Sequence, residues 1–239
     1  MNKKKLLRSL FLGCMLTGSL FASEKRSQFD CENAGMKKVC DFNFVQNSLL
    51  KITNSSKTES LQCVARPFNY HSSLELMKIS KLICANFVKR SGWDLMSDDI
   101  IMLYLQANSP ESLYETMSKS GTRGYVIEDK DMILGVVILR PNQIGDTVND
   151  LQVRRLHVNF EAINYKKVGT ALLTIAAADA FLNNIATLIT TASMPARGFF
   201  EKLGWHGQVI ESHYSIAKQD IALPQFNCTY VLPINFQGF

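Results

Sequence analysis

The stretch from Leu151 to Trp205 constrains the fold more than any other part of the chain. It begins with LQVRRLHV, an apolar and polar pattern typical of a strand, and a polar loop follows. The apolar segment VGTALLTIAAADAFL then predicts a buried helix. A second strand pattern, IATLITTA, and a short helical segment, MPARGFFEKL, come after it. Strands and helices that alternate in this way predict a mixed α/β domain.

The residues between Leu61 and Leu151, and those after Trp205, predict further strands of the same sheet and the helices that cover it. LQCVARPF is typical of a strand that ends in a turn, and SLELMKISKLICANFVKR has apolar residues at helical spacing behind an HSS cap. Two more helices begin at SDD and SPE, and GYVIED and MILGVVILR predict a hairpin around DKD. We expect PNQIGDTVND to be a loop, and a last strand pair to end at CTYVLP. The predicted architecture is a central twisted mixed sheet with helices on both faces.

The first 22 residues have the layout of a bacterial secretory signal. MNKKKLLR is basic, Leu10–Ala22 is apolar, and SEKRSQ ends the apolar stretch, so cleavage is expected after Ala22. The stretch is shorter than the ~20 residues of a spanning helix, so we expect no stable membrane span in the mature chain. An uncleaved anchor, a buried helix and lipidation at Cys14 are alternatives. We divide the chain into this segment (1–22), a polar linker (23–60) with one short helix near Phe44–Lys51, and a domain (61–239).

Composition narrows the functional classes. The chain is 46% hydrophobic and 20% charged, which is ordinary for a globular domain. Its net charge of +5 includes Lys3, Lys4, Lys5 and Arg8, so the rest is close to neutral and predicts no nucleic-acid partner. The six cysteines have no zinc-site spacing, so no metal is expected. In an exported chain Cys31 and Cys40 could form a disulfide; free thiols are the alternative. Cys84 and Cys228 lie in apolar runs, and we expect them in the core.

Two segments resemble the signatures of GNAT acetyltransferases. VRRLHVNFEAINYKKVGTALL, from Val153 to Leu173, is similar to motif A: a strand ending in L-x-V, a loop, then Q/R-x-x-G-x-G/A at a helix start. SMPARGFFEKLGW is similar to the second signature, A-x-x-F-Y/F-E-K-x-G-F. CVARPF also resembles the first strand of the family, and YSIAKQDIALPQFNCTYVLP its closing strand pair. The resemblance covers about residues 60–235. It implies a GNAT-like fold and N-acetyl transfer from acetyl-CoA, the co-substrate, to a primary amine.

The resemblance places coenzyme A at the start of the second long helix. Free N–H groups there and the helix dipole attract a pyrophosphate, and a glycine lets the backbone approach it closely. The strand before this helix splays from its neighbour in the family and offers backbone groups to the pantetheine arm, one of which polarises the thioester carbonyl. The resemblance also places Ser193 near coenzyme A; the alternative is that Ser193 only caps the helix that follows it. The expected cofactor-binding residues are Leu156, Val158, Lys166, Lys167, Val168, Gly169, Thr170, Ala171, Ser193 and Phe200.

The chain departs from the family pattern in three places. Asn164 replaces the usual Gln or Arg, Lys167 replaces the first glycine, and Phe200 replaces the tyrosine that protonates the leaving thiolate in many relatives. Two tyrosines are candidate substitutes for this acid: Tyr214, which we rank as a catalytic candidate, and Tyr165. His157, within L-x-V, is the candidate general base; a side chain that faces a covering helix is the alternative.

The export signal and the co-substrate point to different compartments, because acetyl-CoA is cytosolic. The protein is expected to be periplasmic or secreted, and it could act in a host cell. A cytoplasmic or inner-membrane-anchored enzyme is the second interpretation. The third is an exported module that has lost catalysis and binds coenzyme A or a protein partner. The sequence does not identify the acceptor, which could be a small amine, a peptide amino terminus or a lysine side chain. It also leaves open whether the protein forms a homodimer.

Overall fold

The computed structural model describes residues 48–53, 60–90, 98–144, 147–160, 167–216 and 219–232. All of them lie in one compact unit, Cys31–Phe239. The signal-like segment, the first three cysteines and the loop residues Asn164, Tyr165 and Lys166 lie outside the described residues.

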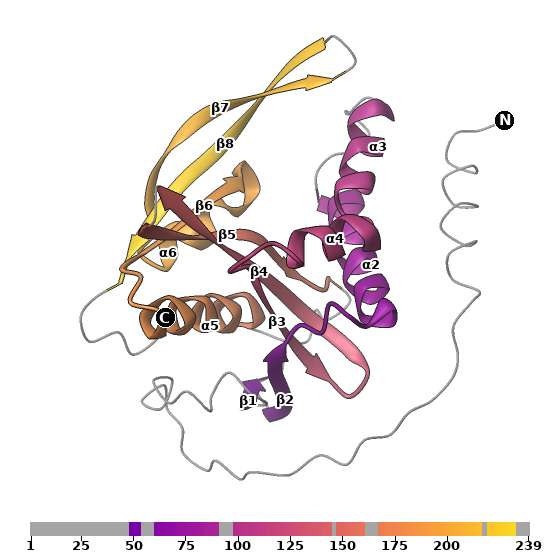
Figure 1. Cartoon of the computed structure of the whole chain (residues 1–239), viewed down its shortest axis with the longest axis vertical. Helices are drawn as coiled ribbons and strands as arrows, with labels where there is room; N and C mark the ends of the chain where they lie inside the picture. The colour runs from indigo at the N-terminus through magenta and orange to yellow at the C-terminus, as the bar shows by residue number, and fades with distance from the viewer. Residues whose placement is uncertain are drawn as a thin grey trace, which may run out of the picture. The chain divides into compact units, whose positions relative to one another are not determined.

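Eight strands and five α-helices make up the described part of the chain (Figure 1). The strands are β1 (Ser48–Thr53), β2 (Ser60–Pro67), β3 (Arg123–Asp129), β4 (Met132–Ile144), β5 (Thr147–Val158), β6 (Thr187–Ser193), β7 (His206–Ile216) and β8 (Gln219–Val231). The helices are α2 (Ser73–Arg90), α3 (Asp98–Ala107), α4 (Pro110–Met117), α5 (Val168–Leu182) and α6 (Arg197–Lys202), with a 3-10 turn, η4 (Met194–Ala196), before α6.

One mixed sheet joins all eight strands in the order β1-β2-β3-β4-β5-β6-β8-β7. Every neighbouring pair is antiparallel except β5 and β6, which are parallel. A parallel pair needs a crossover connection, and α5 supplies it. Helices α2 and α4 lie on one side of the sheet and α5 on the other (Figure 1), so the predicted mixed α/β fold is confirmed.

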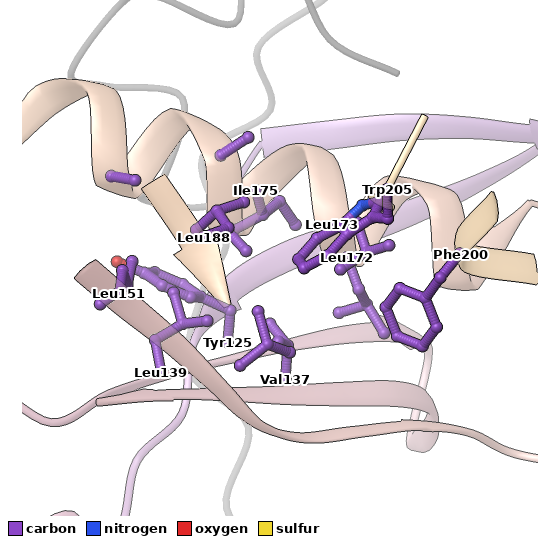
Figure 2. Close-up of a cluster of buried hydrophobic side chains, with 14 of the residues drawn as sticks. Tyr125, Val137, Leu139, Leu151, Leu172, Leu173, Ile175, Leu188, Phe200 and Trp205 are labelled. Carbon is purple, nitrogen blue, oxygen red and sulfur yellow. The ribbon is translucent and has the colours of Figure 1, made fainter. Parts of the chain in front are cut away.

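Each face of the sheet has its own core. Helix α5 is apolar almost all round, as a helix buried on most sides must be. Its residues Leu172 and Leu173 pack with Val137 and Leu151 of the sheet (Figure 2). The alanine run of α5 is buried as well, which brings helix and sheet close together. On the opposite face, α2 and α4 pack on β3 and β4 through apolar side chains such as Ile79. Cys84 and Cys228 are buried, as predicted.

Two details of the sequence interpretation are wrong. The expected loop Pro141–Asp150 is mostly strand: β4 runs to Ile144, β5 begins at Thr147, and Pro141 pairs with Leu151. The expected short helix near Phe44–Lys51 is contradicted by β1, which pairs with β2. Polar composition favoured loop and linker in both places, but strand pairing with an apolar neighbour determines the local structure.

The predicted start signals of α4 and α2 are confirmed. Ser109 lies at the N-cap of α4 and accepts a hydrogen bond from the Ser112 N–H, with Pro110 in the first turn. The Ser72 hydroxyl accepts from the Glu75 N–H at the start of α2. The hairpin turn between β3 and β4 contains Lys130 in the left-handed region, with φ of 53°.

Candidate functional site

Strands β5 and β6 pair over only a small part of their length. Their parallel pairing is restricted to Leu151 with Leu188 and Gln152 with Ile189. Beyond this point β5 stays with β4 as far as Val158, while β6 stays with β8 as far as Ser193. The two inner edges therefore carry backbone groups outside any ladder, and such groups need other partners. This is the splayed pair that the family resemblance implied.

A β-bulge shapes the unpaired part of β5. The register shifts between Ile138 and Leu139 of β4, which pair with Arg155 and Val153, so Arg154 is the extra residue. Because of this extra residue, Leu156 and Val158 pack on the α5 face, as Val153 does before the bulge. Arg155 and His157 alternate with them and take the face of α2.

The start of α5 presents backbone donors that the helix itself does not use. Lys167 at the N-cap makes no side-chain capping hydrogen bond, and the N–H groups of Val168, Gly169 and Thr170 have no helical carbonyl one turn before them. The Ala171 N–H is different from what the sequence suggested, because it already donates to the Lys167 carbonyl at 2.9 Å. Within the described residues, the N–H groups of Val168, Gly169 and Thr170 therefore remain as candidate donors to an anion.

Lys167 adopts a backbone conformation that suits glycine. Its φ is 68° and its ψ is 9°, which is left-handed, and its side chain is exposed. A residue with a Cβ loses roughly 1–2 kcal/mol in this region. The resemblance puts a family glycine at this position, and the conformation gives a physical reason for it. The lysine therefore keeps the shape of the turn and adds a positive charge beside the helix start.

Gly169 brings three elements together. A Cβ at this position would lie 3.1 Å from the ring of Phe199 in α6 and 3.5 Å from a methyl carbon of Val158 in β5. The start of α5 therefore packs against the end of β5 and against α6, on the side where β5 and β6 separate. A larger residue here would require the Phe199 ring to move by a few tenths of an ångström, so the packing alone favours glycine.

Phe200 belongs to the core. It is buried and lies next to Trp205 (Figure 2), edge-to-face at a ring-centroid distance of 5.1 Å. It is also edge-to-face with Phe199, at 5.3 Å. It has no hydroxyl, so it cannot protonate a leaving group. Ser193 occupies the N-cap position of η4, but its side chain makes no capping hydrogen bond and is exposed.

The face of β5 toward α2 holds polar residues that sequence reasoning missed. Asn86 of α2 is 5% exposed, and its Nδ2 donates to the Val158 carbonyl at 2.8 Å. Its Oδ1 is buried and has no hydrogen-bond partner among the residues that the structure describes. Asn108, which follows α3, accepts from Arg155 Nε at 2.8 Å. Asn86 and Asn108 lie in apolar or cap-like contexts in the sequence, so no local pattern marks them.

The structure describes the side chain of only one of the two proton-transfer candidates. His157 lies on the α2 face of β5. Tyr214 lies in β7, where its backbone pairs with Ile221, and its side chain lies outside the described part. Among the described helices, none is long and apolar enough to cross a membrane.

Comparison with known proteins decides the family. The sequence model of the Acetyltransferase (GNAT) domain matches residues 96–214, which include α3 to β5, α5, α6 and most of β7. The chain carries a GNAT acetyltransferase domain. The matched region contains the separated strands, the start of α5 and the α6 signature, so the GNAT domain and the candidate site coincide. A search of curated proteins found no match.

Solved structures share this GNAT fold. A GCN5-related N-acetyltransferase from Rhodopseudomonas palustris has a TM-score of 0.55 and 17% identity, over 77% of this chain and 99% of the other. The PaiA N-acetyltransferase from Thermoplasma acidophilum, solved in complex with coenzyme A, has a TM-score of 0.54 and 15% identity, over 71% and 98%. A probable acetyltransferase from Staphylococcus epidermidis has a TM-score of 0.55 and 16% identity, over 72% and 99%. At these identities the likeness shows the fold.

Proposed function

We propose that this GNAT domain transfers an acetyl group from acetyl-CoA to a primary amine. The observation that carries the proposal is the separation of β5 from β6 next to the uncapped start of α5. A structural neighbour with this fold, the Thermoplasma protein, was solved with coenzyme A, which supports the choice of co-substrate.

The proposed pocket has one part for each part of coenzyme A. The amides of Val168, Gly169 and Thr170 would donate to the pyrophosphate, and the helix dipole adds attraction. Lys167 and Lys166 would add positive charge. The inner edge of β5 at Leu156 and Val158 would hold the pantetheine arm, with exposed Ser193 on the facing strand. The Val158 carbonyl already accepts a hydrogen bond from Asn86. The pantetheine arm would therefore bind to other backbone groups of this edge.

The proposed reaction needs two proton transfers. The lone pair of the amine nitrogen forms a bond to the thioester carbonyl carbon, the carbon–sulfur bond breaks, and the sulfur leaves with the electron pair. The nitrogen gives up one proton and the thiolate takes one. We propose His157 for the base and Tyr214 for the acid, because Phe200 has no proton to give. Replacing a positioned acid or base lowers kcat by about 10²–10⁴-fold, and His157→Gln and Tyr214→Phe test this.

The deciding experiment is acetyl-CoA binding to the full chain and to Thr170→Glu. Thr170 lies in the first turn of α5, where a glutamate is compatible with the helix dipole but repels a pyrophosphate. Acetyl-CoA at ~100 times its dissociation constant should stabilise the wild type by ~2.7 kcal/mol, and Thr170→Glu should abolish the shift. Ser112→Glu, at the same helical position in α4, is the matched control and should keep it. Gly169→Glu should also abolish binding, but Phe199 packs there, so its folding must be checked.

The second candidate function is a binding module without catalysis. Two observations favour it: Phe200 lacks a hydroxyl, and Lys167 holds the family's glycine position with a left-handed backbone. Acetyl-CoA binding without turnover of any amine would support this function. No acetyl-CoA binding at millimolar concentration would contradict both functions that depend on coenzyme A.

The compartment stays a prediction. We propose export, from the layout of residues 1–22, and action where acetyl-CoA is available, such as a host cell. Fractionation of cells that express the chain with and without residues 1–22 tests this. Retention of both forms in the cytosol would contradict it.

A further inference from the structure

Arg155 is a partly buried cation without an acidic partner in the described part of the chain. Its Nε donates to Asn108 Oδ1 at 2.8 Å, and its Nη1 donates to the Arg154 carbonyl at 3.1 Å. No hydrogen bond from its Nη2 occurs among the described residues. Burial lowers the pKa of Arg155, and the nearby charge of Arg154 lowers it further, while Tyr104 acts in the opposite direction. A guanidinium in such surroundings favours a bound anion.

Two other partly buried arginines of the domain, Arg66 and Arg123, are neutralised by carboxylates. Arg66 contacts Glu75 at 2.8 Å and Glu128 at 2.7 Å. Arg123 contacts Asp179 at 2.6 Å. Arg155 is bound instead by a neutral amide and a carbonyl, so its charge remains available to a ligand.

The guanidinium of Arg155 is also held in place. Asn108 is 1% exposed, donates to the Tyr104 carbonyl at 2.7 Å, and accepts from the Ser80 hydroxyl at 2.6 Å through its own carbonyl. Tyr104 in turn stacks on Phe87, with ring centroids 3.8 Å apart. A guanidinium fixed in this way loses little entropy when it binds a planar anion in bidentate fashion.

Position relates this cation to the proposed reaction. Arg155 directly precedes Leu156, at the proposed thioester edge, and takes the face of the sheet opposite α5. If coenzyme A enters from the side of α5, the acceptor must approach from another side. The Arg154–Arg155 bulge lies directly before this edge of β5, and neither arginine has a carboxylate partner within the described residues.

We propose that the acceptor is a primary amine that also carries an oxyanion, a carboxylate or a phosphate, and that Arg155 binds this group. The inference rests on the proposed acetyl transfer and names its substrate class. Arg154, at the bulge, adds charge at longer range. The same charges repel acceptors with several amino groups, because a second ammonium would lie near two guanidinium groups. They also disfavour the ammonium form of a bound acceptor, which helps it lose the proton before attack.

The test uses the full chain, acetyl-CoA and matched pairs of amines. One arm compares ω-amino acids of increasing chain length with their carboxamides, and a second compares O-phosphoethanolamine with ethanolamine. Coenzyme A release and the mass of the product are measured. At least one oxyanionic amine should exceed its neutral partner about tenfold or more in kcat/KM, and Arg155→Gln should lower that value about 10- to 100-fold. The two arms distinguish carboxylate from phosphate recognition.

Two controls isolate the role of Arg155. Lys119→Gln removes one positive charge from an exposed site after α4 and should leave the preference unchanged. Acetyl-CoA affinity should be the same in Arg155→Gln as in the wild type. Turnover without preference for oxyanionic amines, or a preference that survives Arg155→Gln, overturns the proposal but leaves acetyl transfer intact.

A binding measurement covers the case without turnover. N-acetylated ω-amino acids and their carboxamides are titrated into the chain with coenzyme A present, and the acids should bind more tightly. Equal binding of acid and amide, or no binding of either, overturns the anion site. Loss of acetyl-CoA binding itself would instead contradict the proposed function, so the two failures are separate.

Discussion

The hydroxyl of Thr190 donates to the carbonyl of Val153 at 2.8 Å, across the point where β6 and β5 separate. The last paired residues, Gln152 and Ile189, come immediately before them. A side chain therefore replaces the next ladder hydrogen bond. Thr190 is 5% exposed, so the bond lies in the interior, where an unpaired carbonyl is costly. This contact ends the pairing and satisfies the carbonyl at the base of the proposed pocket.

Replacing Thr190 with valine should destabilise the fold and the pocket together. The shapes are nearly equal, but the valine leaves the Val153 carbonyl without its donor, at a cost of about 1–3 kcal/mol. Urea denaturation measures the change, and acetyl-CoA affinity should fall as well. Thr191→Val is the matched control, because Thr191 is exposed on the next position of β6 and should change stability by less than about 0.5 kcal/mol. If the two substitutions lowered the free energy of unfolding equally, the hydrogen bond from Thr190 to Val153 would not stabilise the point where the strands separate.

Lys167→Gly should stabilise the protein. It relieves the left-handed strain of roughly 1–2 kcal/mol, and the greater freedom of glycine in the unfolded chain offsets part of that gain. The expected net increase in unfolding free energy is about 0.5–1 kcal/mol, measured by denaturant titration.

Lys167→Gln separates backbone from charge at the same position. Glutamine keeps the strain and removes the ammonium group, so stability should stay near the wild type while acetyl-CoA binding weakens. If Lys167→Gly were less stable than Lys167→Gln, the left-handed conformation would not be the reason why the family has glycine here.

Asp179→Asn should destabilise the domain strongly without touching the proposed pocket. The Asp179 side chain is 2% exposed and accepts from Arg123 through both carboxylate oxygens, and the Tyr125 hydroxyl donates to it. Removing the charge leaves Arg123 unpaired, at a cost on the order of 3 kcal/mol. Glu201→Gln is the control, because the Arg197–Glu201 pair is more than 40% exposed on both sides and is worth at most about 1 kcal/mol. Thermal unfolding that ranks Glu201→Gln as the more damaging change would contradict this.

Local sequence patterns predicted most helices and strands. They failed where tertiary contacts determine the secondary structure. The apolar run of α5 and the cap at Ser109 were visible in the sequence because each depends on neighbours along the chain. The strand around Pro141 was missed because its pairing with Leu151 outweighs a polar composition.

The geometry around the candidate site was predictable in outline. The resemblance indicated the start of α5 and the separated strands, and Lys167 was visible as a departure from the pattern. The orientation of its backbone required coordinates. Arg155 and Asn108 could not be paired from the sequence, because 47 positions separate them and no motif joins them.

Stability should decline in alkaline solution because two buried cysteines and a partly buried tyrosine are held in their protonated forms. Burial raises the pKa of Cys63 from 9.0 to about 11 and that of Cys228 to about 12, and it raises the pKa of Tyr104 from 10.0 to about 12. The folded state therefore keeps protons that the unfolded chain releases above pH 9–10. The stabilisation is complete below pH 9 and is lost progressively up to about pH 12.

Thermal unfolding between pH 8 and pH 11.5 measures this loss. Each such group lowers the free energy of unfolding by up to ~1.4 kcal/mol per pH unit, over the range where it is ionised in the unfolded chain and still protonated in the folded one. Tyr104→Phe keeps the ring stack on Phe87 and removes one phenol, so its stability should fall less steeply above pH 10. Tyr114→Phe, which removes an exposed phenol on α4, is the matched control. A Tyr104→Phe profile as steep as that of the control would show that the Tyr104 hydroxyl does not take part in the alkaline transition.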